Sequence, residues 1–373
     1  MKLKMLLLVI LVVLLSMYGI YQTPDTVTDT KVTLKGQWIT ETNGQVMLDP
    51  QTSGLKHWRG KLLSISDGSA HQSQSSQLHV IDPKSAVLDE QVMSMTMSEN
   101  VTSSCFAQYL AYKPDFEALA VDPNDDNVVI IVTEDARSIE GLSAECAKRY
   151  QNSGSTDFPS LLVRLYIHDN KSVEMTHVRP LQFSAEFEVG NFPNDGIEGL
   201  AFGQDNQLYL ALEKDIHTQP RIFSVQITKD FWNTDEFAKV LDPELRLPQF
   251  TAGNHPLNGM DYLAIDDHPG YLIAAARNDN QLWFIDLYKQ NPTKIITLDF
   301  MAETNDNSCE PWELMDNSSL EGLGVIGSTI WVVNDPWKRN YLKNINCPSN
   351  QANYEKMAPL LFSLPVAEEW IKH

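Results

Sequence analysis

Basic residues are scarce in this sequence, and their scarcity excludes one class of function. The 373 residues include 28 lysines and arginines against 49 aspartates and glutamates, which gives a formal net charge of −21. Because nucleic-acid binding relies on a basic surface that neutralises phosphates, we expect no nucleic-acid partner. The excess of acid suits a soluble protein, or one that binds cations. Apolar residues make up 43% of the chain, which is enough for a folded core.

Cysteine is scarce too, and it lacks the spacing of a zinc site. The sequence contains no CxxC pair, and its four cysteines fall as two local pairs, Cys105 with Cys146 and Cys309 with Cys347. Three connectivities are possible, and we favour the one that closes these two local loops. A GxSxG nucleophile elbow is also missing. The nine histidines are scattered, and only two of them, in the loops that hold His217 and His255, are worth testing.

Long apolar runs are missing except at the N-terminus. Residues 1–21 open with two lysines and continue as an almost wholly apolar run, which predicts a secretory signal peptide or an uncleaved membrane anchor. The lysines place the N-terminus in the cytoplasm and the rest outside, and the lack of a small-x-small cleavage site favours the anchor. Residues 22–33 form a polar tether, and residues 34–373 form the folded domain. We therefore expect an exported monomer in the periplasm or cell envelope, anchored to the inner membrane, or secreted if residues 1–21 are cleaved.

A strand–turn–strand pattern recurs along the chain, and residues 195–215 are its clearest copy. An apolar run ends at Phe202, a turn follows, and a second apolar run returns from Leu208, which predicts a β-hairpin. Glu198 opens the first run and Glu213 closes the second. Because the two strands are antiparallel, both carboxylates come to the same end of the hairpin.

The other copies of this pattern predict the fold. Their first polar residues are Ser53, Glu117, Asn258 and Glu321. In chain order, with Glu198 in third place, the five residues are separated by 64, 81, 60 and 63 positions. A third apolar strand follows each hairpin, and long helical patterns are missing. Repeats of this kind are typical of a β-propeller. We predict an all-β fold, a single propeller of five blades. A sixth blade, hidden in the longest gap or assembled from the two chain ends, is the alternative.

The repeat signatures resemble a known group of propellers. Ser-Gly-Leu, Glu-Ala-Leu, Glu-Gly-Leu, Asn-Gly-Met and Glu-Gly-Leu open the five copies, and the similarity runs from about Ser53 to Leu364. They resemble the phytase-like propellers, labelled "esterase-like activity of phytase", and the SdiA-regulated propellers, some of which are membrane-anchored in the periplasm. The order Ser, Glu, Glu, small polar, Glu is also similar to the calcium ligands of five-bladed calcium-activated nucleotidases. Asn258 and the run that begins at Lys56 depart from the usual pattern.

In a propeller, the first strands of the blades line the central channel, so equivalent residues form a ring. We expect this ring to be the metal site, and its members are Ser53, Glu117, Glu198, Asn258 and Glu321. Three converging carboxylates raise one another's pKa unless a cation lies among them. Calcium accepts hydroxyl, amide and carboxylate oxygens in flexible geometry, so we expect Ca²⁺. The alternative is that these side chains bond the backbone of neighbouring blades and hold the ring together.

The ends of the returning strands add a second group of charged residues at the channel mouth. We predict that Glu213, Glu134 and Arg277 are catalytic, and that Lys214, Lys338 and Arg339 bind an anionic ligand. Other members are Asp67, Asp135, Asp215, Asp279, Asp335, His71, Arg137 and Trp337. The alternative for each is an ordinary solvated loop residue.

Two functions remain open from the sequence. The first is a calcium-dependent hydrolase that cleaves a small phosphate ester or other ester at the channel mouth. The second is a non-catalytic propeller that binds an envelope ligand or protein and uses calcium as a structural ion. An enzyme needs an open metal position with a base nearby, whereas a binding protein needs a closed metal site and an apolar or aromatic patch.

Overall fold

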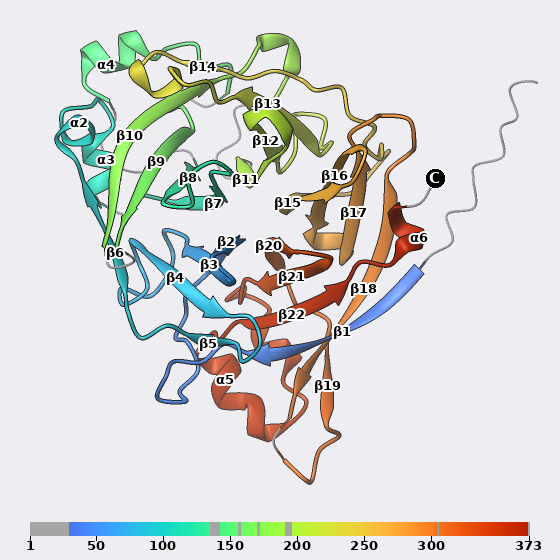
Figure 1. Cartoon of the computed structure of the whole chain (residues 1–373). Coiled ribbons are helices and arrows are strands. Elements are labelled where there is room, and N and C mark those ends of the chain that lie inside the picture. Colours follow the sequence, from blue (N-terminus) through green and yellow to red (C-terminus); the bar gives the residue numbers. More distant parts are fainter. Residues whose placement is uncertain are drawn as a thin grey trace, which may run out of the picture. The chain divides into compact units, whose positions relative to one another are not determined.

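Five short strands, one from each predicted hairpin, lie side by side in a closed ring (Figure 1). They are β2 (Thr52–Trp58), β7 (Phe116–Val121), β11 (Ile197–Phe202), β15 (Leu257–Ile265) and β20 (Leu320–Ile326). Each strand contacts the next one along the chain, and β20 contacts β2. The ring of five inner strands makes the fold a five-bladed β-propeller, as predicted.

The computed structural model describes residues 30–112, 114–134, 142–155, 158–169, 172–190, 196–304 and 306–371. The described residues from Lys31 onward form one compact unit. The predicted signal or anchor, residues 1–21, lies outside the described residues, as does most of the tether. Within the described ranges, no helix is both long and apolar enough to cross a membrane.

Each inner strand starts an antiparallel sheet that runs outward through the strands that follow it. Blade one continues with β3 (Lys61–Ser66) and β4 (Gln77–Asp82), and blade two with β8 (Val128–Thr133), β9 (Leu161–His168) and β10 (Ser172–Gln182). Blade three continues with β12 (Gln207–Leu212) and β13 (Arg221–Gln226), and blade four with β16 (His268–Ala276), β17 (Gln281–Asp286) and β18 (Lys294–Glu303). Blade five continues with β21 (Thr329–Asn334) and β22 (Leu360–Pro365).

The outermost strands, which the sequence marked poorly, come partly from other segments. The N-terminal strand β1 (Thr30–Trp38) pairs antiparallel with β22 and lies next to β18. The two ends of the chain therefore complete blade five together, rather than forming a sixth blade. β6 (Met93–Met97) pairs with β4 and with β10, so it joins the sheets of blades one and two. The remaining short strands are β5 (Val87–Leu88), β14 (Ala238–Lys239) and β19 (Trp312–Met315).

The α-helices in the described ranges are all short, and they lie in the connections between strands or after the last strand. They are α2 (Glu99–Thr102), α3 (Ala107–Tyr112), α4 (Ala144–Arg149), α5 (Gln351–Glu355) and α6 (Glu368–Ile371). The core lies between neighbouring blades: Tyr209 of blade three and Trp283 of blade four, for example, belong to one buried cluster. Large apolar side chains from adjacent sheets thus bury each other, as expected for packed sheets.

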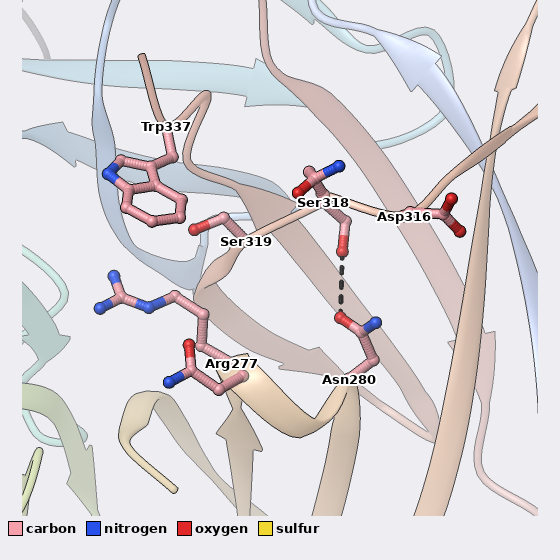
Figure 2. A pocket seen from close by; sticks show the side chains of 8 residues that line it. Arg277, Asn280, Asp316, Ser318, Ser319 and Trp337 are labelled. Atoms are coloured by element: carbon pink, nitrogen blue, oxygen red, sulfur yellow. Dashed lines mark hydrogen bonds between the residues drawn. The ribbon is translucent and has the colours of Figure 1, made fainter. Parts of the chain in front are cut away.

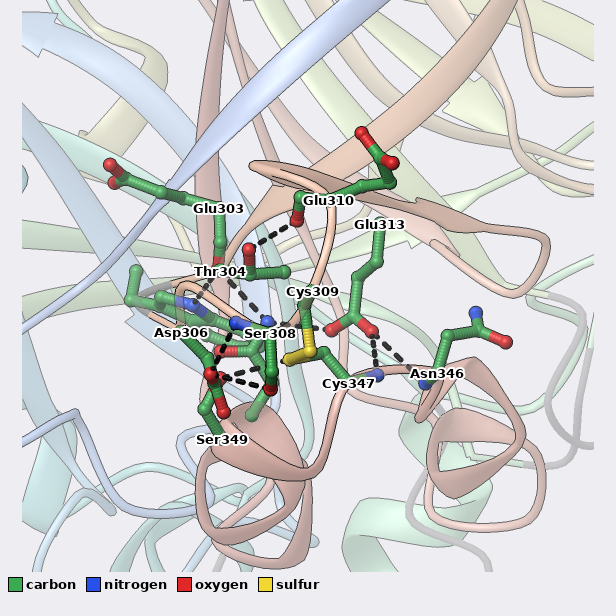
Figure 3. Close-up of a disulfide and its surroundings, with 12 residues drawn as sticks. Glu303, Thr304, Asp306, Ser308, Cys309, Glu310, Glu313, Asn346, Cys347 and Ser349 are labelled. Atoms are coloured by element: carbon green, nitrogen blue, oxygen red, sulfur yellow. Dashed lines mark hydrogen bonds between the residues drawn. A yellow bond between two sulfur atoms is a disulfide. The ribbon is translucent and has the colours of Figure 1, made fainter.

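Two disulfides close the connections, and both have the predicted pairing. Cys105 is bonded to Cys146, and Cys309 to Cys347. Figure 3 shows the second of these beside Glu313, whose carboxylate accepts hydrogen bonds from the backbone nitrogens of Asn346 (3.0 Å) and Cys347 (2.7 Å). The disulfide therefore fastens a loop that a buried carboxylate also holds.

Candidate functional site

A β-bulge in every inner strand positions the ring residues. On four strands the ladder shifts register at the ring residue itself: Glu117, Glu198, Asn258 and Glu321. On β2 the shift falls on Gly54, which follows Ser53 and has a φ of +74°. A bulge leaves one residue out of the pairing and re-aims its side chain. The same local distortion therefore turns one polar side chain per blade towards the others.

Glycine after the ring residue lets the inner strands approach each other closely. A Cβ on Gly259 would stand 2.8 Å from the backbone oxygen of Glu321, and one on Gly322 would stand 2.8 Å from the backbone carbon of Gly54. Both contacts involve backbone of the neighbouring blade, which cannot move aside. The recurring polar-Gly pair thus has a physical origin in the narrow ring.

The ring residues are brought together as the sequence predicted. Carboxylate oxygens of Glu117, Glu198 and Glu321 all lie within 4.8 Å of one another. The Ser53 hydroxyl donates to Glu117 Oε2 (3.4 Å), and Asn258 Nδ2 donates to Glu321 Oε1 (3.0 Å). All five side chains belong to residues that are 8% exposed or less. The five blades therefore each contribute one buried polar group to a single centre.

This centre opens into a cavity of about 210 Å³ with a strongly acidic wall. Among the described residues, eight carboxylates and a single arginine line it: Asp67, Asp115, Glu117, Glu134, Glu198, Glu213, Glu321, Asp335 and Arg277. Oxygens of Asp115, Glu117 and Glu134 form a second close group that shares Glu117 with the first. Asp115 was missed from the sequence, although it stands only two residues before Glu117.

The electrostatics of the cavity favour protons or cations. Burial, followed by the nearby carboxylates, holds the pKa of Glu117 and of Glu198 well above the usual range. Burial also raises the pKa of Glu321, and it raises the pKa of Asp67 to about 7 with the help of Asp115. For Asp335, burial and the charge of Glu321 again raise the pKa well above normal. The carboxylates cannot all ionise at neutral pH without a compensating positive charge.

Arg277 supplies part of that charge. It lies at the start of the turn between β16 and β17, and its Nη1 is 3.0 Å from Glu321 Oε2 while its Nη2 is 3.4 Å from Glu213 Oε1. Burial lowers the pKa of Arg277, but the carboxylates of Glu321, Glu213 and Glu198 outweigh this and raise it. The guanidinium thus acts as an internal counter-ion of the ring.

The three predicted ligand-binding cations do not line this cavity. Lys338 Nζ binds Asp49 Oδ2 at 3.1 Å and donates to the backbone oxygen of Ser69 at 2.8 Å. Arg339 is exposed and Lys214 is half-buried, each outside the cavity wall. Asp135 and Arg137 lie outside the described residues.

The two histidines singled out from the sequence form local ion pairs. His217 Nε2 lies 2.9 Å from Glu188 Oε2. His255 faces acceptors with both ring nitrogens, since Nδ1 is 2.9 Å from Asp279 Oδ2 and Nε2 is 3.0 Å from the backbone oxygen of Ala252. These two contacts fasten the His255 ring to its own loop.

A buried ion pair, which was not predicted from the sequence, links the inner strands β2 and β15. Lys56 Nζ lies 3.3 Å from Asp261 Oδ1 and donates to the backbone oxygens of Met260 and Leu323. Burial lowers the pKa of Lys56 and raises that of Asp261. Lys56 begins the run that departs from the pattern expected from the sequence resemblance. It joins the inner strands of blades one, four and five.

The donors of the ring fit a hard cation such as calcium. All of them are oxygens, and the set mixes carboxylate, amide and hydroxyl groups. Among the described residues, Oδ1 of Asn258 and Oδ1 of Asp335 are buried without a hydrogen-bond partner. Buried polar atoms are normally bonded, so such oxygens are the kind of group that a cation would satisfy.

Comparison with known proteins finds similarity only to solved structures of low sequence identity. No protein-family model matches the sequence, and no curated protein matches it. A luciferin-regenerating enzyme is 9% identical over 84% of this chain and 78% of its own, with a TM-score of 0.38. The PQQ-bound aldose sugar dehydrogenase of Streptomyces coelicolor is 10% identical over 88% and 96%, with a TM-score of 0.35. The Malassezia sympodialis allergen Mala s 1 is 11% identical over 85% and 94%, with a TM-score of 0.45. Similarity at this level carries no inference about function, and the likeness to phytase-like and SdiA-regulated propellers stays a prediction.

Proposed function

We propose that the protein is an exported, calcium-binding β-propeller that hydrolyses a small phosphate ester or other ester at the mouth of its channel. The observation that carries this proposal is the convergence of three buried glutamates from three blades, with their oxygens within 4.8 Å of one another. The described lining of the surrounding cavity includes eight carboxylates and one arginine. A divalent cation would relieve their repulsion, and the all-oxygen donor set favours calcium over zinc.

The roles of the residues follow from their positions. Ser53, Glu117, Glu198, Asn258 and Glu321 would hold the ion. When bound, calcium would polarise the ester or phosphoryl oxygen and lower the pKa of a coordinated water. Glu134 stands on the same cavity wall, is 4% exposed, and would take the proton from that water. Glu213 would orient Arg277, whose guanidinium would face an incoming anionic oxygen.

A specific observation favours a second function, a non-catalytic ligand-binding propeller with a structural calcium. Arg277 is already bonded to two carboxylates, and Lys214, Lys338 and Arg339 do not line the cavity. A site for an anionic ester would normally present a cation that is not already paired. The two functions differ in whether the protein hydrolyses a substrate at the calcium site.

The test is a hydrolysis assay with p-nitrophenyl phosphate, bis-p-nitrophenyl phosphate and p-nitrophenyl acetate, each in calcium and in chelator. The hydrolase predicts turnover that needs calcium and is lost in Glu134→Gln, while calcium still raises the melting temperature of that variant. Stabilisation by calcium without turnover of any substrate would instead support the binding protein. An absence of both effects would reject both functions.

Export and tethering are part of the proposal. Two disulfides support an oxidising compartment, because such bonds are rare in the cytosol. Residues 1–21 would then serve as the anchor. Fractionation of the source cells tests this: the chain should stay with the inner membrane in high salt and dissolve only in detergent, and recovery in the cytosol would contradict it.

A further inference from the structure

A second pocket lies beside the central cavity, between the loops of blades four and five (Figure 2). It has a volume of about 350 Å³, and Arg277 lines both hollows. Its other residues come from the turn between β16 and β17, from the segment before β20, and from the segment after β21. The volume falls in the range of small-molecule sites, roughly 300–1,000 Å³.

The wall of this pocket is polar but carries no net charge. Its charged members are Arg277 and Asp316, one of each sign, and the guanidinium already bonds Glu321 and Glu213. The other polar members are three side-chain amides and two hydroxyls, from Asn278, Asn280, Asn317, Ser318 and Ser319. Neutral amides and hydroxyls in one hollow suit a neutral ligand with many hydroxyl groups better than an anion.

One large aromatic side chain stands on the wall of the pocket. Trp337 is 47% exposed, and within the described part of the chain it makes no ring–ring or cation–π contact. Figure 2 shows its indole on the same side of the pocket as the Ser319 hydroxyl and the Arg277 guanidinium. The electron-rich face of an indole attracts polarised C–H groups, so an exposed tryptophan beside amides offers a platform for a flat, hydroxylated ring.

Two residues that line the pocket have left-handed backbone conformations. Ser319 has a φ of +54° and Asn280 a φ of +50°, both in the left-handed region. Asn280 tolerates this region well, but serine adopts it seldom, so Ser319 is held under strain. The Ser318 hydroxyl donates to Asn280 Oδ1 at 3.4 Å, which orients that amide within the pocket.

We propose that this pocket binds a pyranose unit of a carbohydrate. One face of the sugar ring would stack on the Trp337 indole, and its hydroxyls would bond Asn280, Asn278 and Ser319. The inference stands on the pocket alone and does not rest on calcium or on hydrolysis. It also gives the neighbouring cavity a substrate class, since a sugar held here would bring a substituent towards Arg277 and the ring.

Saturation-transfer NMR and calorimetry on the full chain test the proposal, with lactose, cellobiose and N,N′-diacetylchitobiose as probes and adenosine as a flat-ring comparator. We expect at least one disaccharide to bind in calcium and in chelator alike. Trp337→Ala should weaken its binding by about tenfold or more, the effect expected for loss of a stacking platform. The control is Tyr288→Ala, which removes an aromatic ring that is 48% exposed elsewhere and should leave binding unchanged.

A second variant separates binding from folding. Ser319→Gly relieves the left-handed strain, so it should raise the melting temperature. It also removes the Ser319 hydroxyl, so it should weaken sugar binding by about threefold to tenfold. Binding of none of the three disaccharides would overturn the proposal. So would sugar binding that survives Trp337→Ala, or a Trp337-dependent site that takes adenosine and no sugar. Failure of the hydrolysis assay would leave the sugar-binding proposal intact, because that proposal is tested by binding and not by turnover.

Discussion

Arg277 Nη1 lies 3.0 Å from Glu321 Oε2, and the same guanidinium reaches Glu213 Oε1 at 3.4 Å. The arginine and a bound cation would therefore compensate the same carboxylates. Within the described part of the chain, Arg277 is the one cationic side chain on the cavity wall, so it reduces the negative charge that is left for a metal ion to compensate. Removing the Arg277 charge should therefore lower the stability of the metal-free protein and raise its affinity for a metal ion.

Replacing Arg277 with glutamine should destabilise the metal-free protein and tighten calcium binding. Loss of one partner from a buried ion pair costs about 3–5 kcal/mol, and the 29% exposure of the Arg277 side chain reduces this to about 2–3 kcal/mol. Calcium affinity should rise because a competing positive charge is gone. Urea denaturation in chelator and calorimetry with calcium measure the two effects.

Arg221 is the matched control for this variant. It also binds two carboxylates, those of Asp215 and Asp242, and its side chain is 26% exposed, but it does not line the cavity. Arg221→Gln should lower stability and leave calcium affinity unchanged. Equal shifts in calcium affinity for both variants would contradict the assignment of Arg277 to the metal centre.

The acidic cavity should also make stability depend on pH in a metal-sensitive way. Folding raises the pKa of Glu117 and Glu198 well above normal and that of Asp67 to about 7, so the folded state binds more protons than the unfolded state above about pH 4. Metal-free protein should therefore lose stability as the pH rises from about 5 to 8. Calcium should remove most of this loss, since it replaces the protons. Melting curves across this range, with chelator and with calcium, test the sign; a metal-free protein that gains stability with rising pH would contradict it.

Most of the architecture was predictable because each blade repeats the same hairpin. A polar residue near the start of the first strand recurs in each copy, followed by glycine in four copies and by Ala118 in the second, and this position predicted that Glu117, Glu198 and Glu321 lie close together. The outer strands were not predictable, because they are completed by distant segments: β1 joins β22 across almost the whole chain. This pairing is non-local, so the local sequence pattern does not indicate it.

The charged residues at the channel mouth were predicted less well, for a related reason. Position at a strand end indicates the correct face of the propeller but not where a long side chain points. Lys338 turns to Asp49, whereas Arg277 turns into the ring. In both cases the partner carboxylate belongs to a different blade, so the sequence around the cation does not indicate it. The sequence marked the run from Lys56 as atypical without indicating why, and the structure shows Lys56 paired with Asp261.

The Lys56–Asp261 pair should hold three inner strands together without serving the metal. Lys56→Met leaves the buried Asp261 carboxylate uncompensated and should cost about 3–5 kcal/mol of unfolding free energy. Adding Asp261→Asn removes that charge and should restore part of the loss. Chemical denaturation of the single and double variants measures the coupling. If the double variant is as unstable as the sum of the single changes, the pair is not coupled.

The two disulfides should contribute similar stability. They close loops with sequence separations of 41 and 38 residues, for which loop entropy gives about 4 kcal/mol each as an upper value. Replacing either pair by serines should therefore lower the unfolding free energy by nearly the same amount and leave calcium affinity intact. Urea denaturation of the two variants checks this, and a loss of calcium binding in either one would place that disulfide in the metal centre.

Calcium titration of the metal-free protein tests the central claim most directly. Calorimetry of the wild type should show saturable binding of about one ion per chain, with a higher melting temperature in calcium than in chelator. The double variant Glu198→Gln with Glu321→Gln removes two of the three converging carboxylates and should abolish both the heat of binding and the calcium-dependent stabilisation. A double variant that binds calcium and melts like the wild type in calcium and in chelator would show that the ring is not a metal site.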